Sequence, residues 1–318
     1  MRAVRKISLA RMISDLSNNV KSKTAIIITG PTAVGKTELA IRLAGQLDTE
    51  IISADSRQCY QEMNIGVGRP SPEELAAVPH HFIASHHIEE RVNAAIFEEY
   101  ALEETERILK DRDHVIICGG TGLYIRTFCE GLDEFPDVPY DATAEVDTLF
   151  ELGGLKALQR AIKKEDPLYA AEGEMENPRR IMRALSFIRA TDQSIREFYT
   201  DKPVERPFNI IKIQLDLPRP ELYDRINRRV THMMDQGLWE EAKSLYKHRK
   251  LQALQTVGYR ELFESMDGLI SQDEAVNMIR QHTRNYAKRQ LTWFKKETGM
   301  KVFHPGQFEE ILKYLTTV

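Results

Sequence analysis

Cysteines are scarce in this sequence, and long apolar segments are missing. The 318 residues include only three cysteines, Cys59, Cys118 and Cys129, and no Cys-x-x-Cys spacing. Three cysteines do not make a paired disulfide framework, so we expect a reducing compartment and a cytoplasmic protein. Purely apolar runs span only a few residues. Because a membrane helix needs roughly 20 such residues, we expect no membrane association.

A strong net charge is also missing, but the charges are unevenly distributed. The formal net charge is −4, yet residues 281–301 contain six Lys or Arg against one Glu. A basic segment in a nominally acidic protein indicates a polyanionic partner. The chain is long enough for one large core and a smaller lobe. We expect it to act as a monomer.

Acidic residues are nearly absent from the first 24 residues, which hold six Lys or Arg and one Asp. A basic, acid-poor and serine-containing start resembles an organellar presequence. A disordered leader, or translation that starts at Met12, accounts for the same composition. We interpret residues 1–23 as a leader without fixed structure.

The segment "IIITGPTAVGKTELA" (26–40) fits the phosphate-binding pattern G-x-x-x-x-G-K-[ST] between an expected strand and an expected helix. Consecutive backbone N–H groups and a helix N-terminus would converge there on an anion. Lys36 should neutralise a terminal phosphate, and the Thr37 hydroxyl should bind magnesium. The loop consists of Gly30, Pro31, Thr32, Ala33, Val34, Gly35, Lys36 and Thr37.

Two features that usually accompany such a loop are missing. The expected strand "HVIIC" ends in Gly119 and Gly120, where a hydrolysing enzyme of this class carries its magnesium-binding Asp. No Asn-Lys-x-Asp segment for reading guanine occurs either. These absences suggest that a bound diphosphate serves as a leaving group. Asp55 could then act as a base or an outer magnesium ligand, or it could only cap a helix. Thr121 could likewise contact substrate or cap a helix.

Short β-branched segments alternate with helical patterns in most of the chain. We expect strands within 25–30, 49–56, 114–120 and 208–217, which predicts an α/β fold with a P-loop NTPase-like parallel sheet. The carboxyl ends of such strands form one crevice. An acidic, proline-containing segment after Gly131 leads into helical patterns alone. We therefore predict a core of 24–130 and 206–318 with C-terminal basic helices, and an inserted helical domain at 131–205.

Three basic helices are expected. In "NPRRIMRALSFIRA", Arg179 and Arg183 share a face with Arg180 beside them, and "TRNYAKRQLTWFKK" separates a basic face from an aromatic one. We expect those aromatics to pack in the core, and the two basic faces to bind RNA phosphates. The third helix carries arginines suited to clamp a diphosphate, namely Arg219, Arg225 and Arg229. The histidines of "HHFIASHH" lack standard zinc spacing.

Taken in order, seven motifs resemble those of the tRNA dimethylallyltransferases, from about Thr24 to the C-terminus. These motifs are "GPTAVGKTELA", "SADSRQCYQEMNIG", "PHHFI", "GGTGLYI", "NPRRIMRAL", "QTVGYRE" and "TRNYAKRQLTWF". The resemblance implies transfer of a dimethylallyl group from dimethylallyl diphosphate to N6 of adenosine 37 in the anticodon stem-loop of tRNA. Magnesium would be the cofactor.

The resemblance also implies roles for individual residues. Asp55 would be the general base, with Thr32 and Thr121 as further catalytic residues, and Arg219 and Arg225 would close on the diphosphate. The target adenine must leave the stack of anticodon-loop bases. This costs a few kcal/mol, which contacts between the protein and the tRNA would offset. The implied tRNA contacts are Asp55, Ser56, Arg57, Gln58, Thr121, Arg179, Arg180, Ile181, Met182, Arg183, Gln255, Thr256, Val257, Gly258, Tyr259, Arg260, Arg284, Lys288, Arg289 and Gln290.

The sequence departs from the family pattern in places. "YDATAEVD" lacks the arginine that usually follows the acidic linker, and "VGRP" replaces Thr-Ala-Lys-Pro. Three other functions remain as alternatives: a prenyltransferase for free adenylates, a small-metabolite kinase, and a non-catalytic nucleotide-switched RNA-binding protein.

Overall fold

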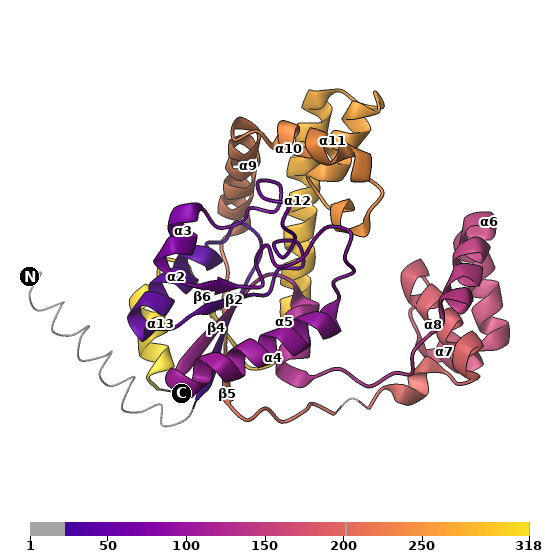
Figure 1. Ribbon diagram of the computed structural model, residues 1–318, viewed down its shortest axis with the longest axis horizontal. Helices are drawn as coiled ribbons and strands as arrows, with labels where there is room; N and C mark the ends of the chain where they lie inside the picture. Colours follow the sequence, from indigo (N-terminus) through magenta and orange to yellow (C-terminus); the bar gives the residue numbers. More distant parts are fainter. Residues whose placement is uncertain (1–22, 201, 318) are drawn as a thin grey trace, which may run out of the picture. The chain divides into compact units, whose positions relative to one another are not determined.

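The computed structural model describes residues 23–200 and 202–317 (Figure 1). The expected leader therefore lies, apart from residue 23, outside the described residues. The chain divides into two compact units, one formed by residues up to 130 together with 205 onward, and one formed by 131–204. No helix in the described ranges is both long and apolar enough to cross a bilayer.

The first unit is built on a single six-stranded parallel sheet in the order β3-β2-β4-β1-β5-β6. Its strands are β1 (Thr24–Thr29), β2 (Ile51–Ser53), β3 (His80–His81), β4 (His114–Cys118), β5 (Asn209–Leu215) and β6 (Met300–Phe303). The predicted α/β class is confirmed. Because β1 lies between β4 and β5, the loop that follows it emerges near the middle of the sheet's carboxyl edge.

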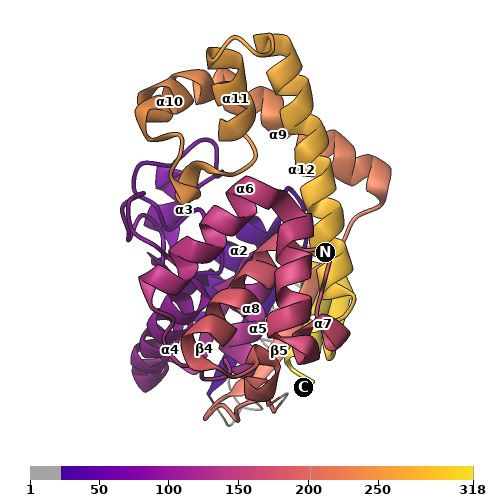
Figure 2. The same ribbon diagram turned by 90° about the vertical axis from the view of Figure 1, so that its right-hand side faces the viewer.

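Alternate residues of the strands enter two apolar cores, as the two-residue period of a strand requires. The helices of this unit are α2 (Lys36–Leu47), α3 (Pro72–Ala77), α4 (Ala94–Asp111), α5 (Gly122–Glu130), α9 (Arg219–Asp235), α10 (Leu238–Leu245), α11 (Tyr259–Met266), α12 (Gln272–Phe294) and α13 (Phe308–Leu315). Ile26 and Ile28 pack on one face with α2 and α13, whereas Ala25 and Ile27 pack on the other with α4, α5, α10, α11 and α12. Figures 1 and 2 show α9, α10 and α11 gathered around the long helix α12.

Three strands differ from the sequence expectation. The strand expected within 49–56 is only three residues long, and β3 and β6 have no counterpart among the four expected strands. β6 pairs with β5 through Lys212–Met300 to Leu215–Phe303. Two of the four residues of β6 are exposed, so its sequence lacks the continuous apolar run that indicates a buried strand.

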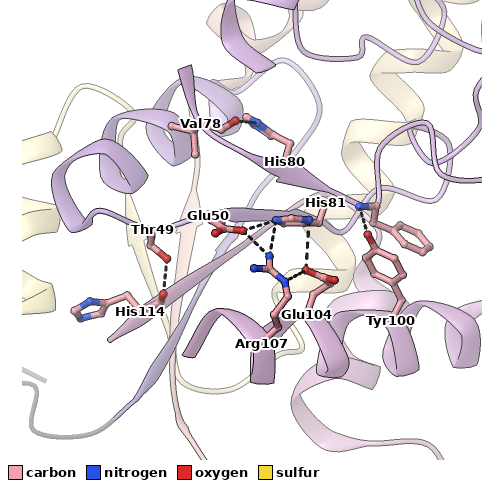
Figure 3. A network of polar contacts seen from close by, with 10 residues as sticks. Thr49, Glu50, Val78, His80, His81, Tyr100, Glu104, Arg107 and His114 are labelled. Atoms are coloured by element: carbon pink, nitrogen blue, oxygen red, sulfur yellow. Dashed lines mark hydrogen bonds and ion pairs between the residues drawn. The ribbon is translucent and has the colours of Figure 1, made fainter. Parts of the chain in front are cut away.

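A polar network joins β2, β3 and α4 at one edge of the sheet (Figure 3). Glu50 accepts hydrogen bonds from His81 at 2.7 Å and from Arg107 at 2.6 Å. Arg107 also donates to Glu104 at 2.8 Å. One histidine of the doubled pair is thus held by carboxylates and a guanidinium. Within the described residues no group of three or more His, Cys, Asp or Glu side chains is placed to hold a metal.

The second unit is helical. It contains α6 (Tyr140–Glu165), which is interrupted at Gly154, α7 (Pro167–Glu172) and α8 (Pro178–Thr191). Asn177 caps α8 by accepting a hydrogen bond from the Arg180 backbone N–H. A separate apolar core forms around Leu158, Ile181 and Phe187.

Candidate active site

The segment after β1 has the backbone of a phosphate-binding loop. Gly30, Ala33 and Gly35 have φ values of 142°, 66° and 105°. A Cβ at Gly30 would lie 2.5 Å from the Leu215 carbonyl oxygen, so a side chain is excluded at that position. The loop ends where α2 begins at Lys36, which points the helix N-terminus toward the loop. This arrangement attracts an anion.

Lys36 is held inside this loop. Its Nζ donates to the carbonyl oxygens of Gly30 at 3.0 Å and of Pro31 at 2.9 Å. Burial lowers the pKa of Lys36 to about 8, while the nearby Cys118 and Asp55 oppose that shift. Burial makes the charged form of Lys36 unfavourable, and a bound anion would stabilise that charged form. Lys36 therefore favours the binding of a diphosphate.

Asp55 follows β2 at the same edge of the sheet. Its Oδ1 accepts hydrogen bonds from the backbone N–H of Arg57 at 2.9 Å and of Gln58 at 3.4 Å. Residues 56–59 form a turn and not a helix, so Asp55 caps no helix, and this turn fixes its carboxylate. Its second oxygen is not used by these contacts, and Asp55 lines both of the cavities described next.

Two cavities meet at Asp55. The first, of about 310 Å³, contains the phosphate-binding loop with Lys36 and Thr37. The second, of about 330 Å³, is lined by Arg57, by residues 255–258 and by Arg289. The residues that line both cavities are Thr32, Asp55, Val67, Arg229 and Tyr286. We call these five residues the junction. A group bound at the loop and a group entering through the second cavity would meet there.

Arg229 is the arginine of α9 that reaches the junction. It donates to Thr32 Oγ1 at 3.4 Å, and burial lowers its pKa while the charge of Asp55 raises it. Arg219 and Arg225, which were also expected at the diphosphate, line neither of the two cavities. Arg219 is exposed, and Arg225 bonds to the Val34 carbonyl oxygen at 3.4 Å and to Glu221 at 3.0 Å. Arg225 therefore lies against the loop backbone, whereas Arg229 lines both cavities, and closure of Arg219 and Arg225 on a bound donor stays a prediction.

The segment 64–68 forms one wall of the junction. Glu241 of α10 accepts hydrogen bonds from the backbone N–H groups of Ile65 at 2.8 Å and Gly66 at 2.9 Å. It also accepts from the Tyr259 hydroxyl at 2.6 Å. Gly68, with φ of 57°, lies so close to Arg229 that a Cβ would be 1.7 Å from its guanidinium. Neither Glu241 nor this close approach was foreseen from the sequence.

Some residues expected to contact tRNA line the second cavity. They are Asp55, Ser56, Arg57, Gln255, Thr256, Val257, Gly258, Arg260 and Arg289. Gln58 lines the first cavity instead and donates to the Gly68 carbonyl oxygen at 2.9 Å. Thr121 accepts a hydrogen bond from the Ser56 backbone at 3.0 Å, so it fixes a cavity residue from behind. On α12, the charged groups of Arg284 and Lys288 lie 6.0 and 5.9 Å from the centroid of the Tyr223 ring.

Three side chains expected to contact tRNA are buried in the described structure, and their contact with tRNA stays a prediction. Tyr259 is fully buried against Glu241, and Ile181 is fully buried in the core of the second unit. Gln290 is also buried. It accepts a hydrogen bond from the Thr32 backbone N–H at 2.9 Å and donates to the Gly120 carbonyl oxygen at 3.0 Å. Gln290 therefore fixes the phosphate-binding loop to the end of β4.

In the second unit, α8 presents its basic residues outward. Arg179 and Arg183 are exposed, and Arg180 is exposed while paired with Glu174. The Arg183 guanidinium lies 4.8 Å from the centroid of the Phe135 ring. Met182 is partly buried against the core. The three arginines thus form an exposed positive face.

The comparisons with known proteins agree with this geometry. A model of the IPP transferase family matches residues 58–297. The tRNA dimethylallyltransferase of Cytophaga hutchinsonii is 42% identical over 294 residues, which cover 92% of this chain and 97% of that relative. The solved structure of a tRNA isopentenylpyrophosphate transferase from Bacillus halodurans is 35% identical, with a TM-score of 0.69 over 93% of this chain and 96% of that chain. The chain therefore belongs to the IPP transferase family.

Proposed function

We propose that this protein transfers the dimethylallyl group of dimethylallyl diphosphate to N6 of adenosine 37 in tRNA and releases diphosphate. One observation carries the proposal: a phosphate-binding cavity and a second cavity share a junction that contains Asp55. The named relatives are tRNA dimethylallyltransferases, which supports tRNA as the acceptor. We expect the reaction in the cytoplasm.

The first cavity binds the donor. The diphosphate accepts hydrogen bonds from the loop backbone and is neutralised by Lys36, with Arg229 at its inner end. As the bond between the allylic carbon and the diphosphate oxygen breaks, its electron pair leaves with the diphosphate. Fixed positive groups that surround the leaving group stabilise this separation of charge.

The second cavity receives the adenine. Its polar wall, which includes Arg57 and Thr256, leads from the surface to the junction. The exocyclic N6 is a weak nucleophile because its lone pair is delocalised into the ring. A carbon–nitrogen bond forms at the junction, and the N6 proton passes to the carboxylate of Asp55. The backbone N–H groups of Arg57 and Gln58 hold that carboxylate in place.

Magnesium fits the first cavity as a companion of the diphosphate. Thr37 lines that cavity beside Lys36, and magnesium in such sites is bound by few protein oxygens together with phosphate oxygens and water. When bound, it would neutralise charge on the departing diphosphate.

One incubation tests the proposal against its alternatives. The protein is mixed with radiolabelled dimethylallyl diphosphate, magnesium and unmodified tRNA, and parallel reactions contain AMP or ATP instead of tRNA. Label should enter tRNA alone, and digestion should place it on adenosine 37. Label in AMP would identify a free-adenylate prenyltransferase. Turnover of ATP without prenyl transfer would identify a kinase or a nucleotide-switched protein.

A further inference from the structure

The junction combines three polar side chains with two that offer apolar surface, one aliphatic and one aromatic. Thr32, Asp55 and Arg229 supply the polar groups, whereas Val67 and the ring of Tyr286 supply apolar surface. A five-carbon allyl group is apolar and must lie between the diphosphate and the base. Of the five junction residues, only Val67 and Tyr286 offer it apolar contact.

Tyr286 is unusually exposed for its place on α12. Its neighbour Ala287 is fully buried and Gln290, one turn on, is 6% exposed, yet Tyr286 is 36% exposed. The sequence predicts core packing for this ring because it lies opposite the basic face of the helix. The ring instead borders both cavities. Its surface is therefore available to a bound ligand.

The surroundings of Tyr286 suit a cation. The face of an aromatic ring carries negative partial charge and attracts cations within about 6 Å of its centroid. The Arg289 guanidinium already lies 5.7 Å from the Tyr286 centroid. Arg289 lines only the second cavity, so it does not cover the ring where it borders the first. The pKa of Tyr286 is raised by burial of its hydroxyl and by the negative charge of Asp55, so the ring stays neutral.

We propose that the ring of Tyr286 receives the dimethylallyl group and stabilises the positive charge that develops on its allylic carbon. This inference rests on the proposed function and concerns only its transition state. As the carbon–oxygen bond to diphosphate breaks, the allyl group becomes electron-poor before the bond to N6 is complete. The ring gains its electrostatic attraction only then, so it lowers the barrier without tightening the binding of the uncharged allyl group.

The test is a series of fluorinated rings at position 286. Tyr286 is replaced by phenylalanine and by its 4-fluoro, 3,5-difluoro and 3,4,5-trifluoro analogues, which weaken the negative face with little change in size. The rate constant of the chemical step is measured by rapid quench with saturating tRNA and donor. We expect Tyr286→Phe to retain most of the rate, and the trifluoro ring to be about tenfold slower than phenylalanine. A rate that does not change across the series overturns the proposal.

Two further measurements separate charge stabilisation from simple packing. Tyr286→Leu keeps an apolar contact and should slow the chemical step by about 10- to 30-fold, with the KM for tRNA within about threefold of wild type. A higher KM with an unchanged rate would identify a base-stacking role and overturn the proposal. Affinity for the unreactive dimethylallyl thiolodiphosphate should stay constant across the fluorinated series.

The controls separate this inference from the function on which it rests. The same fluorinated series at Tyr314, which packs against Phe303 away from both cavities, should leave the rate unchanged. If the wild-type protein does not prenylate tRNA at all, the proposed function fails. If it does and the rates at position 286 are flat, only the role of Tyr286 fails.

Discussion

Replacing Asp55 by asparagine removes its charge and basicity but preserves its geometry. Oδ1 of an asparagine can still accept the hydrogen bonds that Arg57 and Gln58 donate at 2.9 and 3.4 Å. The turn after β2 should therefore remain, and the free energy of unfolding should change by less than about 1 kcal/mol. Alanine removes the acceptor as well, so it confuses loss of the turn with loss of the base.

The expected effect of Asp55→Asn on catalysis is large. A positioned general base contributes about 10²- to 10⁴-fold, which corresponds to about 2.7–5.5 kcal/mol of transition-state stabilisation. The variant also removes a negative charge close to Lys36, which that charge otherwise keeps protonated. Loss of the Asp55 charge also removes its repulsion of the diphosphate, which offsets the weaker protonation of Lys36. The affinity for the donor should therefore stay within a few-fold of wild type.

The assay is single-turnover transfer of label from dimethylallyl diphosphate to tRNA, alongside donor affinity by calorimetry. Asp113→Asn is a matched control, because that carboxylate is 60% exposed and pairs with Lys23 at the surface. A rate for Asp55→Asn within tenfold of wild type would refute the assignment of Asp55 as the base. A large loss of donor affinity at a normal maximal rate would assign it to the donor instead.

Three other predictions concern binding, stability and RNA contact. Donor affinity should be constant below about pH 8 and should fall above it. The reason is that Lys36 has a pKa of about 8 without donor, and the bound diphosphate raises that pKa. Calorimetry in buffers of different ionisation enthalpy should detect the proton uptake. Glu241→Ala should lower the free energy of unfolding by about 2–4 kcal/mol in denaturant titrations, because it leaves the N–H groups of residues 64–66 and the Tyr259 hydroxyl without their acceptor. Joint replacement of Lys288 and Arg289 by alanine should reduce the salt dependence of tRNA binding by about two in log–log slope.

Each of these predictions has a clear contrary result. Donor affinity that stays level up to pH 10 would mean that Lys36 does not meet the diphosphate. Glu240, next to Glu241, is the control for the loss of a carboxylate on α10, and equal destabilisation of both variants would remove the special role of Glu241. An unchanged salt slope would exclude this part of α12 from the RNA surface.

The parts of the site that the sequence predicted are those fixed by local rules. The phosphate-binding loop has a fixed order of glycines because its backbone needs positive φ values. Asp55 was found because the carboxyl ends of parallel strands meet at one edge of the sheet. These inferences need no knowledge of how distant helices pack.

The parts that the sequence left undetermined depend on packing. Arg229 lies three residues after buried Ile226 and one before buried Val230. An arginine next to the buried face of a helix was the feature of the sequence that could have indicated its place in the site. Arg219 and Arg225 are of the same type and differ only in the side of the helix they occupy. For Tyr286, a ring that fills a core and a ring that borders a cavity give the same apolar periodicity.

Three side chains on one side of α12 contact separate parts of the candidate active site. Tyr286, Gln290 and Trp293 are separated by four and three residues and so stand above one another on one side of the helix. The first borders the junction, the second ties the loop to β4, and the third contacts Gly122 at the start of α5, where a Cβ would lie 2.3 Å from its ring. A one-residue insertion before position 286 would rotate all three by about 100° together. The positions of these three side chains are therefore fixed by the number of residues that precede them in α12. We expect substitutions in this helix to disturb the site far less than insertions or deletions.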